Sequence, residues 1–415
     1  MLPPTDAATV DLTGGHLPDA AWTWFTDPRA VVDPDAPDGP RTLAGFVTAD
    51  GDVAVCWRDA ATGETGATVL HADFEADDHD VPALHVRPDG RYLAVYARHH
   101  ADPHLRWRVS TDPGDPTAWR DERSLDLDAP VTYANLHPTG DGGDRLACLT
   151  RARNWNPVLC RSDDAGSSWT EAGEVLTWGD EGCRPYVRYA GDGERLHLVA
   201  TEDHPRDHPT GQVHGVLDGG EVARADGSVV GTVGDDPASV ADLTPVHGPG
   251  EKVDDTYLTR AWPLDHALDG EDRPVAVFQA RAEDDPADHR FCWARLEDGE
   301  WEVRALCRGG PGLYDREADY TGLAALDPAD PTRVVVSTPV DPRDGDDLAY
   351  HELFQGETAD GGRYWTWTAL TPDADADNLR PVVPDARDES AALLWMRGEY
   401  RTYLDWDTQV VGRFG

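Results

Sequence analysis

This 415-residue sequence predicts an all-β fold of seven repeated sheets, and three observations indicate that fold. Apolar runs rich in Val, Leu, Tyr and Trp, each about 5–8 residues long, alternate with Asp-Gly, Gly-Asp and Pro-Asp turns, and helical periodicity is nearly absent. A unit of three or four such runs recurs about every 50–60 residues, as in the blades of a β-propeller. A polar turn motif that ends in Trp supports the same fold. We therefore predict a seven-bladed β-propeller that forms a single domain over residues 1–415.

The predicted blades follow one another along the chain, and each begins with an extended segment that leads through a turn into an apolar strand. The segment 8–12 would supply a missing outer strand to the last blade, because a ring that stays open exposes a sheet edge. We expect strands at 29–32, 42–48, 52–58 and 66–71; 81–86, 92–97 and 105–110; 132–136, 145–150 and 158–162; 184–190, 196–201 and 212–217; 259–263, 275–280 and 291–296; 320–326, 333–338 and 350–354; and 379–383, 391–396 and 401–405.

The turn motif consists of Ser162, Asp164, Gly166 and Trp169, which match the pattern Ser-x-Asp-x-Gly-x-x-Trp of an Asp box. Its polar side chains would form hydrogen bonds with backbone groups of the turn, and its Trp would pack between strands. Degenerate copies occur at 111–119 and 359–365, at the corresponding place in other blades. The motif is typical of propellers and has a structural role.

The composition excludes several partners. A formal net charge of −43 rules out nucleic acid and anionic membranes as default partners, because phosphate binding needs clustered positive charge. Lys252 is the only lysine, and aspartate exceeds glutamate, as in proteins of a salt-rich cytosol. No apolar run reaches the roughly 18–20 residues of a membrane span, and the start of the chain lacks a leader pattern, so we expect a cytoplasmic protein. The six cysteines form no CxxC pair, which favours small buried side chains over a disulfide scaffold.

Candidate site residues follow from the geometry of a propeller. The start of each innermost strand and the end of the next strand meet at one face, around the mouth of the central channel. His, Tyr and Arg are concentrated at these positions. The residues that we expect there are His79, His99, His100, Tyr133, Arg151, Arg153, Arg184, Tyr186, Asp203, His204, Arg281, Glu317, Asp319, Tyr320, Arg397 and Tyr400.

These residue types suit the β-elimination of a uronate. An arginine pairs with the carboxylate and makes the C5 proton more acidic, and a neutral His or an ionised Tyr removes that proton. A Tyr or His then protonates the leaving oxygen. An imidazole needs little adjustment of its pKa for the role of base. The alternative is that the histidines are ordinary loop residues and the arginines are ion-paired to some of the many carboxylates.

Six stretches of the sequence, at 22–29, 77–84, 184–189, 203–207, 319–322 and 379–381, resemble the BNR-4 family of seven-bladed propellers, and the resemblance extends over 22–411. That family is similar to ulvan lyases and other uronate lyases, and it includes rhamnosidases that cleave rhamnose linked to glucuronate. The resemblance implies that His79 and His99 are paired catalytic histidines, although His100 could take the place of His99. It also implies that Tyr133 is the acid/base, that Arg151 neutralises the carboxylate and that Arg184 and Tyr186 line the acceptor side.

The remaining candidates are assigned to substrate binding, and no cofactor is expected to be required. They are His100, His204, Arg281, Tyr320, Arg397 and Tyr400. A structural divalent metal could be held by Cys183, His204 and His214, although these residues lack a diagnostic metal-binding spacing.

The sequence therefore predicts a lyase for uronate-containing, ulvan-like glycans, with an anionic oligosaccharide or polysaccharide as partner. We expect a monomer or a small homo-oligomer. Two alternatives stay open: a glycoside hydrolase of the rhamnosidase or sialidase-like type, in which Tyr400 would pair with Glu317 or Glu399, and a noncatalytic glycan-binding propeller. The acidity of the chain does not exclude an acidic substrate, because arginines at the channel mouth would make the site locally positive.

Overall fold

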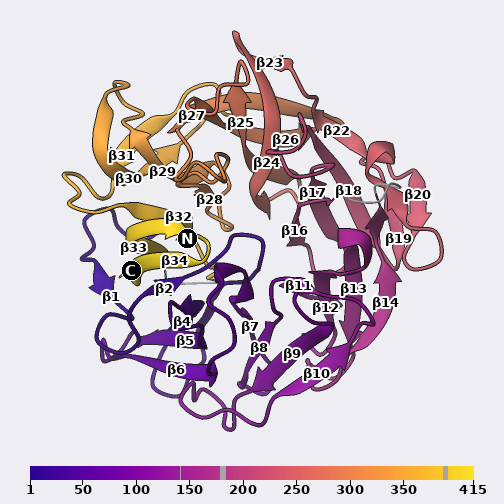
Figure 1. The fold of residues 1–415 in the computed structure, drawn as a ribbon, viewed down its shortest axis with the longest axis vertical. Coiled ribbons are helices and arrows are strands. Elements are labelled where there is room, and N and C mark those ends of the chain that lie inside the picture. Colours follow the sequence, from indigo (N-terminus) through magenta and orange to yellow (C-terminus); the bar gives the residue numbers. More distant parts are fainter. Residues whose placement is uncertain (141, 178–183, 387–390) are drawn as a thin grey trace. The chain divides into compact units, whose positions relative to one another are not determined.

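The computed structural model describes residues 1–140, 142–177, 184–386 and 391–415, and nearly all of its regular structure is β (Figure 1). The chain forms two compact units. The first unit comprises Met1–Arg153, Pro157–Glu174 and Val382–Gly415, and the second comprises Asn154–Asn156 and Val175–Pro381. The predicted all-β class is confirmed, and within the described residues seven sheets have four or more strands. The prediction of a single domain stays a prediction.

The sheets of the first unit are antiparallel and are built mainly from strands that follow one another in sequence. One has the order β2-β4-β5-β6 with β3 also paired to β4, and others have the orders β10-β9-β8-β7 and β11-β12-β13-β14. The strands are β2 (Ala20–Ala21), β3 (Ala30–Asp33), β4 (Arg41–Thr48), β5 (Val53–Asp59), β6 (Thr65–His71), β7 (Ala83–Val86), β8 (Tyr92–Tyr96), β9 (His104–Val109), β10 (Arg123–Asp126), β11 (Thr132–Pro138), β12 (Leu146–Arg151), β13 (Pro157–Ser162) and β14 (Thr170–Glu174), and a short 3-10 helix, η1 (Asp78–Asp80), precedes β7.

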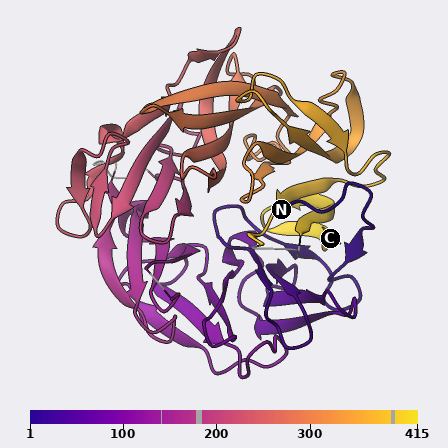
Figure 2. The ribbon, with the colours of Figure 1, turned by 180° about the vertical axis from the view of Figure 1, so that it is seen from behind.

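Both chain ends lie in the first unit, close together in Figures 1 and 2. The strand β1 (Val10–Asp11) pairs antiparallel with β34 (Asp405–Phe414), which in turn pairs with β33 (Ala392–Thr402). In this register Val10 lies opposite Gly412. The segment predicted to be an extra outer strand is thus a strand, at the edge of a sheet built from the end of the chain.

The second unit contains longer strands and more irregular pairing. Its larger sheets have the orders β16-β17-β18-β19-β20 with β22 on β18, β23-β24-β25-β26-β27, and β28-β29-β30-β31. Its elements are β15 (Leu176–Thr177), β16 (Val187–Gly191), β17 (Leu196–Ala200), β18 (Gln212–Asp218), β19 (Glu221–Ala223), β20 (Val229–Thr232), β21 (Ala238–Ser239), η3 (Val240–Asp242), β22 (Thr244–His247), β23 (Glu251–Val253), β24 (Thr256–Leu268), β25 (Pro274–Ala282), β26 (His289–Glu297), β27 (Glu300–Gly310), β28 (Ala324–Leu326), β29 (Arg333–Val340), β30 (Asp347–Glu357) and β31 (Thr366–Ala369); η2 (Arg153–Trp155) and β32 (Asn378–Val382) span the boundaries between the units.

Several inner strands differ in extent from the prediction, for local reasons. β7 begins at Ala83 rather than at 81, because the preceding residues form η1 and Pro82 has no N–H to donate. Pro185 has the same effect at the start of β16. In β24 the pairing with β25 shifts twice, so one bulged strand of 13 residues replaces the short strand predicted at 259–263.

The core of the first unit lies between neighbouring sheets. Central strands are buried along their whole length, as β4, β8 and β12 show. Trp107 from one sheet and Trp169 from the next belong to one buried cluster with Val95, Leu136 and Cys148. The cysteines that the structure describes are free thiols, and burial raises the pKa of the Cys56 and Cys148 thiols to about 12. These two cysteines are therefore small core side chains, as predicted.

The turn around Asp164 is closed by its own side chains. Ser162 Oγ accepts from Gly166 N at 2.8 Å, and Asp164 Oδ1 accepts from Ser168 N at 2.8 Å, while Trp169 is buried. The arrangement is repeated at the degenerate copy at 359–365. There Thr358, directly before the copy, takes the place of Ser162, and its Oγ1 accepts from Gly362 N at 3.0 Å. Among the described residues, no helix has the length and apolar character needed to cross a membrane.

Candidate active site

A short 3-10 turn presents the first of the two paired histidines. Asp77 caps η1, and its Oδ1 accepts from the backbone N–H of His79 at 2.9 Å. The turn is held from both sides by backbone hydrogen bonds, one from Asp78 N to Tyr403 O and one from Thr23 N to Asp78 O, each 3.0 Å long. His79 is therefore fixed by groups that lie far apart in the sequence.

Asp77 joins the two histidines through its two carboxylate oxygens. Its Oδ1 lies 2.6 Å from Nδ1 of His79, and its Oδ2 lies 2.8 Å from Nδ1 of His99. The two imidazole rings are stacked, with their centres 3.8 Å apart and their planes 8° from parallel. Because Nδ1 of His99 bonds to the carboxylate of Asp77, Nε2 is the nitrogen through which this ring would meet a substrate.

The surroundings push the pKa values of the two histidines in opposite directions. Burial by itself lowers the pKa of His79, but the carboxylates of Asp77 and Asp78 outweigh it and raise that pKa to about 9. Burial, followed by the charge of His79, lowers the pKa of His99 below its usual value. At neutral pH His79 is thus a cation and His99 a neutral base. The side chain of His99 is also the more exposed of the two, at 25% against 4%.

His79 has a second acidic partner. Asp78 Oδ1 lies 3.0 Å from Nδ1 of His79, and Asp78 Oδ2 accepts from the hydroxyl of Tyr400 at 2.5 Å. Tyr400 was predicted to bind substrate, but the structure buries it and places it behind Asp78. Glu399, a partner of Tyr400 in the sialidase-like alternative, pairs instead with Arg401 at 2.7 Å.

Two of the residues named from the sequence, Tyr133 and Arg151, lie beside the histidine pair. The ring centre of Tyr133 is 5.7 Å from that of His79, and the guanidinium of Arg151 lies 4.7 Å above the ring of Tyr133. Tyr133 has a left-handed backbone, with φ of 65°, where the pairing of β11 with β12 shifts register. A bulge of this kind redirects a side chain, and such backbone strain is concentrated at functional sites.

The structure separates His99 from His100. His99 contacts Asp77, His79 and Tyr403, whereas His100 has a left-handed backbone, with φ of 58°, and its N–H donates to Val131 O at 3.1 Å. Burial and the nearby Arg151 lower the pKa of His100 to about 4. Of the two neighbours, His99 is the one that belongs to the histidine pair.

Of the other predicted residues of the first unit, Arg397 lies on β33, opposite Gln409 of β34, and Arg153 pairs with Glu171 of β14. Four of the predicted residues, Arg184, Tyr186, Asp203 and His204, meet in the second unit. The ring of Tyr186 lies 5.3 Å from that of His204, and Arg184 pairs with Asp203 and Asp207. Burial, together with Arg206 and Arg184, lowers the pKa of His204 to about 3, so it is neutral.

Arg281 and Tyr320 have buried partners in the same unit. Arg281 donates twice to the carboxylate of Asp319, at 2.7 Å each, and His289 Nε2 lies 3.1 Å from the same carboxylate. The ring of Tyr320 packs against Trp262, with 5.5 Å between the centres. The guanidinium of Arg281 is therefore already matched by a carboxylate, which leaves it less suited to a substrate carboxylate than the prediction assumed.

Metal-ligating groups occur in the first unit at the histidine pair itself. Asp77, His79 and His99 offer one donor atom each, and these atoms lie within 4.8 Å of one another. Of the predicted metal ligands, Cys183 lies outside the described residues. His204 packs against Trp262, whereas His214 contacts His197 and Trp301.

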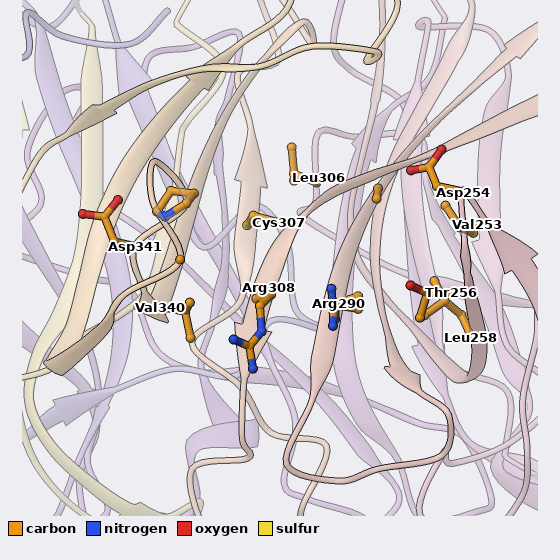
Figure 3. A pocket seen from close by; sticks show the side chains of 13 residues that line it. Val253, Asp254, Thr256, Leu258, Arg290, Leu306, Cys307, Arg308, Val340 and Asp341 are labelled. Carbon is orange, nitrogen blue, oxygen red and sulfur yellow. The ribbon is translucent and has the colours of Figure 1, made fainter.

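A separate hollow of about 260 Å³ lies in the second unit (Figure 3). Arg290 and Arg308 line it together with apolar side chains such as Leu258 and Val340. Both guanidiniums face Asp288, with Arg290 at 2.7 Å and Arg308 at 3.6 Å. None of the sequence-predicted site residues lines this hollow.

Sequence reasoning gave no role to Asp77, Asp78 or Tyr403. The acidic pair directly before His79 was a visible signal, because adjacent carboxylates raise the pKa of an imidazole. Tyr403 approaches both histidine rings edge-on, with centres 5.2 Å and 5.8 Å away. It lies in the tight turn between β33 and β34, and nothing in its local sequence marks it.

A protein-family model and several solved structures match this chain. Residues 41–308 match the sequence model of a BNR repeat-containing family member. The chain is similar to the structure of a PL25 polysaccharide lyase, an ulvan lyase bound to -[GlcA(1-4)Rha3S]-, with a TM-score of 0.68, 14% identity, and coverage of 97% of this chain and 95% of that one.

A second PL25 ulvan lyase structure gives a TM-score of 0.67 at 15% identity, covering 97% of this chain and 95% of that one. The polysaccharide lyase Uly1 gives 0.57 at 9% identity, covering 92% and 88%. No curated protein matches the chain. These likenesses show the fold, a seven-bladed β-propeller.

Proposed function

This chain belongs to the BNR repeat-containing family, and we propose that it is a polysaccharide lyase that cleaves uronate-containing glycans by β-elimination. The observation that carries the proposal is the stacked histidine pair of the first unit, in which Asp77 bonds both rings while one ring is cationic and the other neutral. Two titratable groups whose pKa values are driven apart are typical of acid–base sites.

The proposed reaction follows from these states. Nε2 of His99 takes the C5 proton of the uronate, the C4–C5 double bond forms, and the bond from C4 to the leaving oxygen breaks. Tyr133 donates its phenolic proton to that oxygen, and the proton held by His99 later restores the phenol. The positive charges of His79 and Arg151 stabilise the negative charge that builds on the uronate carboxylate.

Arg184, Tyr186 and His204 are proposed as a separate glycan-binding group. Their rings and guanidinium form one cluster in the second unit, and aromatic faces and arginines suit an acidic oligosaccharide. The substrate class that we propose is a rhamnose–glucuronate glycan, because one structure with a similar fold is an ulvan lyase bound to -[GlcA(1-4)Rha3S]-.

The test is incubation of the chain with ulvan or with glucuronate-rich oligosaccharides at high salt. A lyase produces an unsaturated uronate that absorbs in the near ultraviolet. We expect H99N to lower kcat by about 10²–10⁴-fold, since it removes the base. His104 of β9, which lies outside the cluster, supplies the control H104N, which should behave like the unchanged protein.

The other outcomes decide between the alternatives. Release of reducing sugar without new absorbance would identify a hydrolase of the rhamnosidase type, and binding without turnover would identify a glycan-binding propeller. Full lyase activity in H99N would refute the assigned base.

A further inference from the structure

The turn between β33 and β34 contacts the histidine pair, and the reaction proposed above gives it no role. The turn consists of Tyr403 and Leu404, because Thr402 of β33 lies opposite Asp405 of β34. Arg401 closes it with two hydrogen bonds to the carboxylate of Asp405, at 2.7 Å and 2.9 Å. The side chain of Leu404 is exposed, whereas Tyr403 is partly buried. The two neighbours therefore have different surroundings.

The backbone of Tyr403 holds the short helix that carries His79. Its carbonyl oxygen accepts from the N–H of Asp78 at 3.0 Å, and Asp78 is the first residue of η1. This hydrogen bond joins segments that lie far apart in the sequence. Tyr403 thus contacts the site through its main chain as well as through its ring.

The ring of Tyr403 lies beside the stack of His79 and His99 and not above it. Its centre is 5.2 Å from that of His79 and 5.8 Å from that of His99, so the two distances differ by only 0.6 Å. A ring above one outer face of the stack would be farther from the second imidazole by up to the 3.8 Å that separates the two centres. Tyr403 therefore meets the edges of both imidazoles.

The aromatic face of Tyr403 receives these edges. Its plane is turned by 89° from that of His79 and by 81° from that of His99, so either its face or its own edge could point at the stack. Two rings that met edge to edge with centres 5.2 Å apart would have atoms within about 3 Å of one another, closer than carbon atoms pack. A face-to-edge contact fits the distance, and the negative face of one aromatic ring attracts the positive edge of another.

His99 depends on this contact more than His79 does. His79 is held by Asp78 in addition to Asp77, and its side chain is nearly buried. His99 is the more exposed of the two, at 25%. Its hydrogen bond to Asp77 fixes one point of the ring, and the stack fixes one face. The contact with Tyr403 limits the remaining movement of the ring within its own plane.

We propose that Tyr403 is a positioning residue that holds the imidazole of His99 in the orientation needed to reach the C5 proton. This inference rests on the proposed lyase function, in which that ring is the base. Reacting atoms must lie about 3–3.5 Å apart, and a displacement of about 1 Å can lower a rate by about 10²-fold. Loss of the Tyr403 ring would therefore slow the chemical step and leave substrate affinity nearly unchanged.

The first test compares initial rates of unsaturated uronate formation from ulvan in Y403L, Y403F and L404A. We expect Y403L to lower kcat by about 10–10²-fold with little change in KM, because the aromatic face is lost. Y403F keeps that face and should react at nearly the rate of the unchanged protein. L404A alters the exposed neighbour in the same turn and serves as the matched control. A fully active Y403L would overturn the role, and so would a Y403F as slow as Y403L, because the hydroxyl group would then be responsible.

NMR of the folded protein decides the contact independently of turnover. Protons above an aromatic face are shielded, and protons at its edge are deshielded. In protein with labelled histidine and tyrosine, the imidazole C–H signals nearest to Tyr403 should therefore move downfield in Y403L and stay in place in L404A. Nuclear Overhauser effects between these protons and the Tyr403 ring in the unchanged protein keep the proposal testable if Y403L does not fold. Upfield shifts, or the absence of these effects, would overturn it.

Failure of the proposed function has a different result. An unchanged protein that forms no unsaturated uronate would refute the lyase and with it the role of Tyr403 in elimination, while the NMR signals would still show whether its ring holds the histidine pair. An active unchanged protein with an equally active Y403L would refute the positioning role alone.

Discussion

Asp77 is the residue that gives the two histidines different protonation states. Each of its oxygens holds one Nδ1, and although burial opposes ionisation, the two imidazoles keep the pKa of Asp77 well below its usual range. The fixed carboxylate keeps a proton on His79, and that proton in turn disfavours a second charge on the stacked His99. One acidic side chain thus sets two protonation states.

Replacing this carboxylate by an amide tests the role directly. D77N should lower kcat/KM for the proposed elimination by about 10²–10⁴-fold, because an amide cannot accept from both rings and the imidazole tautomers change. The pKa of His79, followed by NMR, should fall from about 9 toward its ordinary value.

The matched control is D80N in the same turn. Burial and the carboxylates of Asp77 and Glu75 raise the pKa of Asp80 well above its usual value, whereas that of Asp77 is lowered, so an amide removes less negative charge at Asp80 than at Asp77. The D80N variant should therefore keep most of its activity. Equal losses of activity in D77N and D80N would show that both substitutions act by destabilising the turn.

The raised pKa of His79 also predicts a pH dependence of stability. The folded pKa of about 9 lies above the unfolded value near 6.5, so the contribution is complete below pH 6.5 and is lost as pH rises toward 9. The full effect is on the order of 3 kcal/mol. Urea unfolding at pH 6 and pH 9.5 should show this loss in the unchanged protein and much less of it in H79Q. Parallel losses in both proteins would place the titration elsewhere.

At the scale of elements, the position of η1 depends on how closely β4 approaches it. A Cβ atom on Gly45 of β4 would lie 2.6 Å from the carbonyl oxygen of Pro82 and 2.8 Å from its Cγ. Pro82 is separated from η1 by one residue, so the backbone that carries His79 has no room to move toward β4. A glycine in a strand interior is here a requirement of close packing.

The variant G45A should therefore push the segment that carries His79. We expect a loss of about 1–3 kcal/mol in unfolding free energy, with a fall in kcat that exceeds any change in KM. G15A is the control, because a Cβ atom there meets nothing within 4 Å. Unfolding curves and initial rates measure both effects, and a fully active G45A would show that η1 tolerates displacement.

The sequence predicted the repeated sheets more completely than the site. Strand alternation and turn residues are local signals, so the strands of the first unit fall close to their expected ranges. His79 and His99 were found because each lies next to a strand end. The roles of Tyr400 and Tyr403 could not be found in this way, because their contacts with Asp78 and with the histidine rings join residues more than 300 positions apart.

At the scale of the whole molecule, the net charge of −43 is the dominant property. Many arginines are already paired, as Arg281 is with Asp319, so the surplus carboxylates repel one another. The Debye length falls from about 10 Å at 0.1 M salt to about 3 Å at 1 M, which removes most of this repulsion. Salt should therefore stabilise the folded chain against its own charge.

We expect the thermal midpoint to rise steeply between 0.05 and about 0.5 M NaCl and then to level off. Screening saturates in this way because the Debye length is by then shorter than most distances between surface carboxylates. Exclusion of salt from the protein surface would instead give a rise that continues with concentration, most strongly in sulfate. Calorimetry in NaCl and in Na₂SO₄ at matched ionic strength distinguishes charge screening from exclusion of salt. A midpoint that does not change below 0.5 M would mean that the acidic surface costs the fold little, and that its composition reflects solubility alone.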